Sequence, residues 1–365
     1  MAPRPLSAVV LAAGEGTRMR SERPKPLHLL CGRPMVRYVL DALGDCDVDR
    51  VVVVVGHGAE RVTKKLQADD SDYLLDFVEQ HAQLGTGDAT SVGLTAFPDV
   101  DDADDADVLV LPGDTPLLRP ATIRALVEHH RSSDVACTVL TARFADPSGY
   151  GRVVRGRDGR VARIVEHRDA TPEQREIDEI NTSIYCFRRS VLAPALRRLQ
   201  PVNDQGEYYL TDVVEVLSDA GYGVSAVTAD DTDETHGVND RSQLAAAEAE
   251  LRRRTNLEWL RRGVTMVDPD RTYVDTTVDL ATDVTLFPGT ILQGRTVIGE
   301  GSEIGPDTRL VDCIVGARST VEQATGRDAE VGADAHVGPY AHLAPGTSVP
   351  DGTTTGPFHA ATDAG

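Results

Sequence analysis

A glycine-containing loop near the N-terminus carries two cations at a spacing that suits an anionic ligand. It reads Leu-Ala-Ala-Gly-Glu-Gly-Thr-Arg-Met over residues 11–19, and Pro24-Lys25 follows. Glycines let backbone N–H groups approach a phosphate closely, and Arg18 and Lys25 add full positive charge. In a chain of formal net charge −21, two cations beside such a loop indicate phosphate binding. Short glycine-rich loops are more often ordinary turns, so the rest of the chain must decide between the two interpretations.

The segments that must position this loop alternate between strands and helices. Apolar runs predict strands over residues 7–11, 50–55, 74–79, 107–111 and 135–141, and helical patterns lie between them over residues 35–43, 60–67, 88–96 and 120–130. Such alternation is typical of βαβ units and predicts an α/β, mostly parallel, doubly wound sheet. Ligands of these sheets bind beyond the carboxyl ends of the strands. Because Gly14 and Asp114 both follow such ends, we expect them to face one pocket.

The pattern changes after Tyr150. Residues 152–154 and 161–164 flank an Asp158-Gly159 turn and predict a hairpin. A further strand is predicted over residues 180–187 and a helix over 208–217.

The last third of the chain differs in kind. Residues 241–262 are rich in Ala, Glu, Arg and Leu and predict a helix that acts as a spacer. Between residues 278 and 356 an aliphatic residue followed by glycine recurs, as in Ile298-Gly299 and Ile304-Gly305. A period near six predicts a β-helix of hexapeptide repeats, with roughly four coils in this span. We therefore predict three regions, residues 1–240, 241–263 and 264–365.

Composition narrows the class of protein. The chain of 365 residues, 41% hydrophobic, is long enough for two domains with substantial cores. Its five cysteines are scattered and never form C-x-x-C, which favours a reducing compartment without disulfides or a zinc site. The acidic balance argues against a nucleic-acid partner, and no apolar stretch is long enough to span a membrane. With no secretory signal at the N-terminus, we expect a cytoplasmic protein.

Eight motifs in order resemble one bacterial family. They are LAAGEGTRM…PKPLH, QLGTGDA, GDTPLL, GYGRVVR, IVEHRDAT, EINTSIYCF, QGEYYLTD and GVNDRSQL. Together they resemble the bifunctional N-acetylglucosamine-1-phosphate uridyltransferase/glucosamine-1-phosphate acetyltransferase family. The resemblance runs from Leu6 to about Leu343. It implies a Rossmann-like nucleotidyltransferase domain, a linker helix and a left-handed β-helix through which the chains assemble as a homotrimer.

The resemblance also implies roles for individual residues. Catalysis falls to Arg18, Lys25 and Asp114, and a catalytic Mg²⁺ is held by Asp114 and Asn239. The nucleotide and sugar contacts fall to Leu11, Ala12, Ala13, Gly14, Lys25, Gln80, Gly85, Thr86, Gly113, Gly151, Glu166, Asn181 and Asn239. Within the second set, Gln80, Gly85 and Thr86 are expected to bind the uracil edges. Gly151, Glu166 and Asn181 are expected at the sugar, although by themselves Glu166 is as well explained as a surface carboxylate and Asn181 as a strand-edge amide.

The implied reaction is nucleotidyl transfer from UTP to N-acetylglucosamine-1-phosphate, which yields UDP-N-acetylglucosamine and pyrophosphate. The attacking phosphate is already an anion, so no protein nucleophile is needed. Two alternatives remain: a paralogue that uses another sugar-1-phosphate or nucleoside triphosphate, and a non-catalytic nucleotide-binding scaffold. Intact Arg18, Lys25, Asp114 and Asn239 argue against the scaffold.

Several positions depart from the family pattern. Ala344 in LAPGT replaces an arginine that binds the sugar phosphate of the acetyltransferase, Thr362 aligns with a lysine, and the catalytic histidine would lie beyond Gly365. These departures predict that acetyltransferase activity is lost. In the first domain, Pro112 stands where relatives have Tyr or Ser, Asp88 replaces a His, and Ser183 replaces a Gly. Because Pro112 and Ser183 lie near the expected nucleotide and sugar sites, the sequence does not determine which base and which sugar the protein binds.

Overall fold

The chain divides into two units, residues 1–28 with 34–243 and residues 29–33 with 244–365. The computed structural model describes residues 4–67, 73–97 and 106–360. Among the described residues, none of the helices combines the length and apolar character that crossing a bilayer requires. The cysteines Cys31, Cys46, Cys137, Cys186 and Cys313 are all buried, and none of them is joined in a disulfide.

The first unit is built on one sheet, to which nine strands contribute within the described ranges. Its strands are β1 (Leu6–Ala12), β4 (Arg50–Val55), β5 (Leu74–Glu79), β6 (Asp107–Pro112), β7 (Cys137–Arg143), β8 (Arg152–Arg155), β9 (Val161–Val165), β10 (Glu179–Arg188) and β11 (Val224–Thr228). The order is β11-β7-β10-β6-β1-β4-β5, and β8 with β9 forms the predicted hairpin beside β10. β1 pairs in parallel with both β4 and β6. Central strands are buried on both faces, which explains their continuous apolar runs.

One strand departs from the expected parallel arrangement. β10 lies between β6 and β7 and is antiparallel to both. Its pairing with β7 slips between Asn181 and Ile184, where a β-bulge interrupts the register. The apolar run of β10 is compatible with either direction, so the sequence could not show that this strand reverses.

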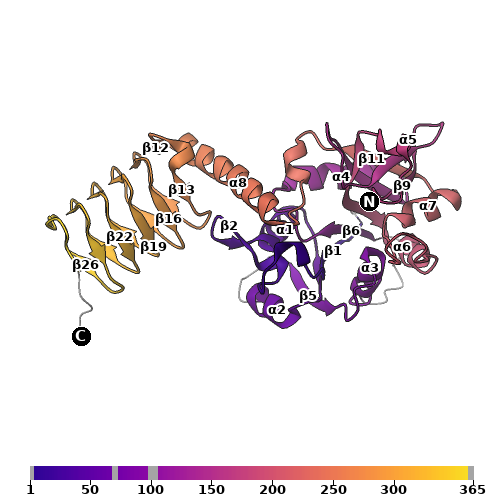
Figure 1. Ribbon diagram of the computed structural model, residues 1–365, viewed down its shortest axis with the longest axis horizontal. Coiled ribbons are helices and arrows are strands. Elements are labelled where there is room, and N and C mark those ends of the chain that lie inside the picture. Colours follow the sequence, from indigo (N-terminus) through magenta and orange to yellow (C-terminus); the bar gives the residue numbers. More distant parts are fainter. Residues whose placement is uncertain (1–3, 68–72, 98–105, 361–365) are drawn as a thin grey trace. The chain divides into compact units, whose positions relative to one another are not determined.

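Helices cover both faces of the sheet (Figure 1). α1 (Met35–Gly44), α2 (Ala59–Gln67) and α4 (Pro120–Ser133) share one apolar core with the sheet. α3 (Thr86–Leu94), α6 (Arg189–Leu196) and α7 (Asp212–Asp219) share the core on the opposite face. The helix predicted over residues 208–217 begins only at Asp212, and α6 and β11 were not predicted at all.

The second unit contains a β-helix, which α8 (Arg241–Arg261) precedes in the chain. Its strands are β12 (Thr265–Met266), β13 (Tyr273–Val274), β14 (Asp279–Leu280), β15 (Thr285–Leu286), β16 (Ile291–Gln293), β17 (Val297–Ile298), β18 (Glu303–Ile304), β19 (Arg309–Val311), β20 (Ile314–Val315), β21 (Thr320–Val321), β22 (Thr325–Arg327), β23 (Glu330–Val331), β24 (His336–Val337), β25 (His342–Leu343) and β26 (Ser348–Val349). In its described part they form three parallel sheets of five strands each, the stacked coils of a left-handed β-helix (Figure 1).

Five strands per sheet correspond to five coils, one more than the roughly four predicted for residues 278–356 alone. The first coil begins at Thr265, before the aliphatic-glycine rhythm becomes visible at residue 278. Inside the coils, equivalent aliphatic residues such as Leu286, Ile304 and Val321 stack in register and are fully buried. This stacking supplies the continuous core that an isolated repeat lacks.

Candidate active site

The predicted site residues of the first unit line one cavity. Its volume is about 700 Å³, enough for a nucleotide and part of a second substrate. Gly14 follows β1 and Asp114 follows β6, and both line it as expected. The cavity is also lined by Leu11, Ala12, Ala13, Arg18, Lys25, Gln80, Gly85, Thr86, Gly113, Gly151, Glu166, Asn181 and Asn239. The structure thus brings the predicted residues together, while their roles stay predictions.

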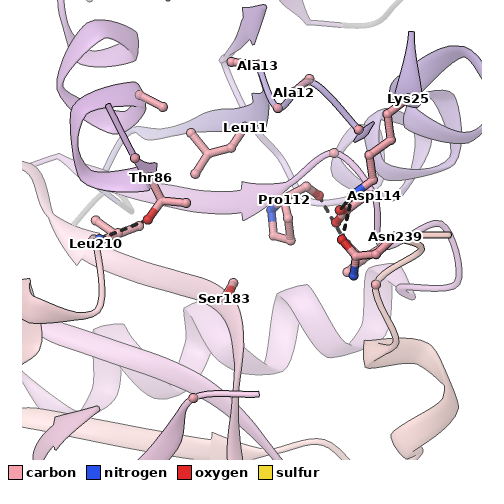
Figure 2. A pocket seen from close by; sticks show the side chains of 18 of the residues that line it. Leu11, Ala12, Ala13, Lys25, Thr86, Pro112, Asp114, Ser183, Leu210 and Asn239 are labelled. Atoms are coloured by element: carbon pink, nitrogen blue, oxygen red, sulfur yellow. Dashed lines mark hydrogen bonds and ion pairs between the residues drawn. The ribbon is translucent and has the colours of Figure 1, made fainter. Parts of the chain in front are cut away.

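At one end of the cavity a lysine joins two oxygen-bearing side chains (Figure 2). Lys25 Nζ donates a short hydrogen bond to Asp114 Oδ2 and another, of 2.9 Å, to Asn239 Oδ1. Arg18 Nη2 donates to the same Asn239 oxygen at 3.0 Å. A backbone hydrogen bond of 2.8 Å from Val238 N to Asp114 O fixes the loop of Asn239 against the end of β6.

This end of the cavity fits a hard divalent cation. Asp114 and Asn239 direct a carboxylate and an amide oxygen at one positively charged atom, Lys25 Nζ, which takes the place of a cation. Oxygen ligands of this kind suit Mg²⁺, which keeps several waters and takes further oxygens from substrate phosphates. No cluster of three or more His, Cys, Asp or Glu residues suited to a metal occurs in the described part of the chain. The protein would therefore supply only part of the coordination shell.

The opposite end is formed by the loop between β5 and α3. Gln80 follows β5, is 4% exposed, and its backbone N–H donates to Val55 O at 2.8 Å. Gly85 has φ +107°, and a Cβ on it would lie 2.6 Å from Tyr208 O. Only glycine allows this contact with the backbone. Leu210 N donates to Thr86 Oγ1 at 3.0 Å (Figure 2), so the Thr86 hydroxyl helps to fix this wall of the cavity.

A third part of the cavity collects uncharged and acidic hydrogen-bonding groups. Asn181 is 3% exposed and donates through Nδ2 to the Tyr185 hydroxyl at 2.7 Å. Glu166 accepts a hydrogen bond of 3.2 Å from Thr211 Oγ1. Burial raises the pKa of Glu166, and the nearby carboxylates of Asp212 and Asp169 add to the effect. Gly151 lies between Glu166 and Asn181, because a Cβ built on it would come within 3.6 Å of each.

These contacts contradict the alternative explanations that the sequence allowed for Asn181 and Glu166. Asn181 is not a strand-edge amide, because it lies inside β10 and pairs with Thr141 of β7. Glu166 is not a freely exposed surface carboxylate, because it is half-buried in the cavity wall and accepts a hydrogen bond from Thr211. Neither outcome could be read from the sequence, since both depend on strands that meet only in the folded chain.

Ser183 is the departure with the clearest structural consequence. It occupies the bulge of β10 with φ +63° and lines the cavity (Figure 2). A residue with a Cβ is strained in this left-handed conformation, which glycine adopts freely. Its backbone N–H donates to Asn181 Oδ1 at 3.1 Å, and the side chain is exposed to the cavity. A hydroxyl therefore stands where a glycine would leave open space. Pro112, at the end of β6, also lines the cavity.

Sequence reasoning missed some lining residues, of which Tyr150 stands out. It packs edge-on against Phe144, which in turn stacks on His236 with 4.7 Å between ring centroids. Burial raises the pKa of the Tyr150 hydroxyl, as does the charge of Asp114. The motif GYGRVVR contained Tyr150, but a lone aromatic beside two glycines gave no signal of its own.

Comparison with known proteins places the chain in a family. A family model described as a MobA-like NTP transferase domain matches residues 8–220. The protein named bifunctional protein GlmU from Geobacillus thermodenitrificans is 44% identical over 324 residues, 89% of this chain and 69% of that protein. Its namesake from Thermobifida fusca is 46% identical over 330 residues, 90% of this chain and 68% of that protein. This chain belongs to the GlmU family.

Membership in the GlmU family settles the class of reaction. The matching NTP transferase domain, over residues 8–220, includes most strands of the sheet and most residues that line the cavity, while β11 and Asn239 lie beyond it. The chain is a nucleotidyltransferase that acts on a sugar-1-phosphate. The resemblance inferred from the eight motifs is confirmed, as is the α/β fold followed by a β-helix.

Proposed function

We propose that this GlmU-family chain is a Mg²⁺-dependent cytoplasmic uridyltransferase that makes UDP-N-acetylglucosamine and pyrophosphate from UTP and N-acetylglucosamine-1-phosphate. The observation that carries the proposal is the convergence of Lys25, Asp114 and Asn239 at one end of a cavity with amide, hydroxyl and carboxylate hydrogen-bonding groups elsewhere in its wall. This division suits a triphosphate at the cationic end and uncharged base and sugar groups along the wall.

The chemistry requires positioning and charge neutralisation. An oxygen of the sugar phosphate attacks the α-phosphorus of UTP in line, the new P–O bond forms, and the bond to the leaving pyrophosphate breaks. No proton needs to be removed from the attacking oxygen. A bound Mg²⁺ would neutralise phosphate charge next to Asp114 and Asn239. Arg18 and Lys25 hold the two mutually repelling substrates together and stabilise the charge that develops on the transferred phosphoryl group.

Displacement of Lys25 is part of this proposal. Lys25 Nζ donates hydrogen bonds to the same two oxygens that we assign to Mg²⁺. With Mg²⁺ held by Asp114 and Asn239, the Lys25 ammonium group would be available to bind a substrate phosphate. The same side chain thus neutralises the Asp114 carboxylate, and it would neutralise phosphate charge when substrates are bound.

The sugar end supports an N-acetylhexosamine. Asn181 has an amide suited to an acetamido or hydroxyl group, and Glu166 is a half-buried acceptor for sugar hydroxyls. Ser183 supports the alternative of another sugar-1-phosphate, because its hydroxyl stands in the cavity wall beside Asn181.

We further propose that the chain has no acetyltransferase activity. Ala344 lies just after β25 and offers a methyl group where the family pattern has a phosphate-binding arginine. Thr362, the second departure, lies outside the described residues. An assay with glucosamine-1-phosphate and acetyl-CoA tests this, and acetylation above the rate without protein would contradict it.

A homotrimer through the β-helix is proposed on different grounds. Val297 and Ile314 are neighbours on two strands of one sheet and are 38% and 51% exposed. Apolar side chains aligned on an outer face favour self-association. Sedimentation velocity should give three times the chain mass, and a monomer at micromolar concentration would contradict the proposal.

Pyrophosphate release is the experiment that tests the main proposal. The full chain is incubated with Mg²⁺, UTP and N-acetylglucosamine-1-phosphate, and beside it with other nucleoside triphosphates and sugar-1-phosphates. We expect release with the named pair and none in EDTA. Turnover only with another pair of substrates would show that the protein is a paralogue with a different substrate. No pyrophosphate release with any pair would favour a nucleotide-binding scaffold.

A further inference from the structure

The side chain of Gln80 has an orientation that its neighbours impose. Gln80 Nε2 donates to Asp88 Oδ2 at 2.7 Å and to Gly85 O at 3.2 Å. A carboxylate and a backbone carbonyl are both acceptors without a hydrogen to give. The amide nitrogen must therefore face Asp88 and Gly85, because the flipped amide would set its oxygen against two others.

Both amide hydrogens of Gln80 are used in these two bonds. Gln80 lines the cavity, and its Oε1 accepts no hydrogen bond from the described residues. Oε1 is thus the amide atom left to meet a ligand, and it can only accept. The backbone bond from Gln80 N to Val55 O and the 4% exposure of the residue leave little freedom to change this arrangement.

Asp88 is suited to act as a fixed partner. It is the third residue of α3, half-buried, in the first turn of a helix where a negative charge is favourable. A charged acceptor also makes a stronger hydrogen bond than a neutral one. Asp88 is not among the residues that line the cavity, so any effect on a ligand must pass through Gln80.

We propose that Asp88 is a positioning residue for base selection, because it locks Gln80 as a hydrogen-bond acceptor and so requires a base that donates a ring N–H. The inference rests on the proposed function, in which this end of the cavity holds the base. The imide N3–H of uracil satisfies the requirement. Cytosine instead has an acceptor at N3, which would face Gln80 Oε1 and leave two acceptors opposed. Sites built on a hydrogen bond reject analogues that cannot make it much more strongly than sites built on shape.

The test compares UTP with CTP in the full chain. Rates with Mg²⁺ and N-acetylglucosamine-1-phosphate give kcat/KM for each nucleotide, and calorimetry gives the two dissociation constants without turnover. For Asp88→Asn we expect the UTP-to-CTP ratio to fall by at least about tenfold, the equivalent of one charge-assisted hydrogen bond. The asparagine can turn its own amide, so only the longer hydrogen bond to Gly85 O would still favour the acceptor orientation of Gln80.

Two further variants distinguish an effect of the Asp88–Gln80 hydrogen bond from an effect on folding or on local charge. Asp88→Glu keeps an obligatory acceptor and should retain most of the UTP preference. Glu207→Gln removes a carboxylate from the same end of the cavity, since the Glu207 Cβ lies 3.0 Å from a Cβ built on Gly85. No hydrogen bond joins Glu207 to Gln80 among the described residues. The UTP-to-CTP ratio of Glu207→Gln should therefore equal that of the wild type.

The outcomes distinguish this inference from the proposed function. If the wild-type chain prefers UTP and Asp88→Asn lowers activity with both nucleotides while keeping their ratio, Asp88 is structural and the lock is wrong. If the wild type prefers dTTP, the substrate assignment fails but the lock is supported, since thymine has the same N3–H. A wild type that prefers CTP overturns both.

Discussion

The two units bury polar side chains in different ways. In the first unit the buried polar groups include charged and amide side chains such as Asp107, Arg152 and Asn181. In the β-helix they include small hydroxyls that bond to backbone carbonyls, as Thr290 Oγ1 does to Phe287 O at 2.7 Å and Ser319 Oγ to Gly332 O at 2.7 Å. The partners in the β-helix lie within the same coil or one coil away.

This difference distinguishes a repetitive scaffold, the β-helix, from the unit that contains the candidate active site. A coil repeats the same local solution, so each hydroxyl finds its partner at a fixed distance along the chain. In the first unit Lys25 contacts Asp114 and Asn239, which lie 89 and 214 residues away in the sequence. Contacts of this kind do not repeat along the chain as the coil contacts do. The first unit should therefore lose stability or function through single polar changes, and the β-helix should lose stability through single apolar ones.

The buried charge cluster around Asp107 should show the largest effect. Asp107 is fully buried, and Arg131 Nε lies 3.0 Å and Arg4 Nε 3.3 Å from its Oδ2. Asp107→Asn leaves these cations without their counter-charge, and we expect the free energy of unfolding to fall by about 3–5 kcal/mol. Chemical denaturation measures this. The exposed Asp219→Asn is the control and should change it little.

The same cluster predicts a pH dependence. Burial alone would raise the pKa of Asp107, but His130, Arg131 and Arg4 outweigh it and hold the pKa below its usual range. A carboxyl whose pKa is lower in the folded than in the unfolded state stabilises the protein above the unfolded value and loses that effect as the pH falls through the folded value. Stability should thus decline below about pH 4, and less steeply in Asp107→Asn. An equal slope in both proteins would contradict this.

Lys25→Ala should give the largest loss of catalysis. Removal of a preformed electrostatic donor lowers turnover by ~10²–10³, and we expect that range for kcat in the pyrophosphate assay. Lys64→Ala, on the exposed face of α2, removes the same charge away from the cavity and should keep the wild-type rate. Near-normal turnover of Lys25→Ala would refute its role.

Leu292→Ala tests the β-helix side of the comparison. Leu292 is fully buried in the stacked core, so the cavity left behind should cost about 3 kcal/mol. Hydrogen exchange should register the loss in residues 265–349, while the initial rate of nucleotidyl transfer at 25 °C stays unchanged. A matching loss of kcat would show that catalysis depends on the β-helix core. Exposed Leu257→Ala serves as the matched control.

Ser183 should give the smallest effect and the most selective one. Ser183→Gly removes the strain of a φ of +63° and should stabilise the protein by about 0.5–1 kcal/mol. Ser183→Ala retains the strain and loses only the hydroxyl. If both variants change the KM for the sugar-1-phosphate alike, the lost hydroxyl causes the change in KM. If only the glycine variant changes the Tm, the relief of backbone strain causes the change in Tm.

The sequence by itself indicated most strands and helices, the β-helix repeat and a pocket at the ends of the strands, although α6 and β11 were not predicted. Apolar runs such as the valines of residues 51–55 form strands because only burial on both faces accounts for them. The aliphatic-glycine period fixed the β-helix because stacked coils repeat their core positions. Gly14 and Asp114 could be placed at one pocket because the carboxyl ends of parallel strands share an edge of the sheet.

Tertiary structure decided what depends on direction and on distant partners. The reversal of β10 was invisible because an apolar run pairs equally well in either direction, yet it buries Asn181 and puts the bulge of Ser183 in the cavity wall. Asp88 was visible in sequence only as a departure from a family pattern. Its hydrogen bond to Gln80 needs the loop between β5 and α3 to fold back on itself, because side-chain orientation is set by the acceptors that surround an amide and not by its position in the chain.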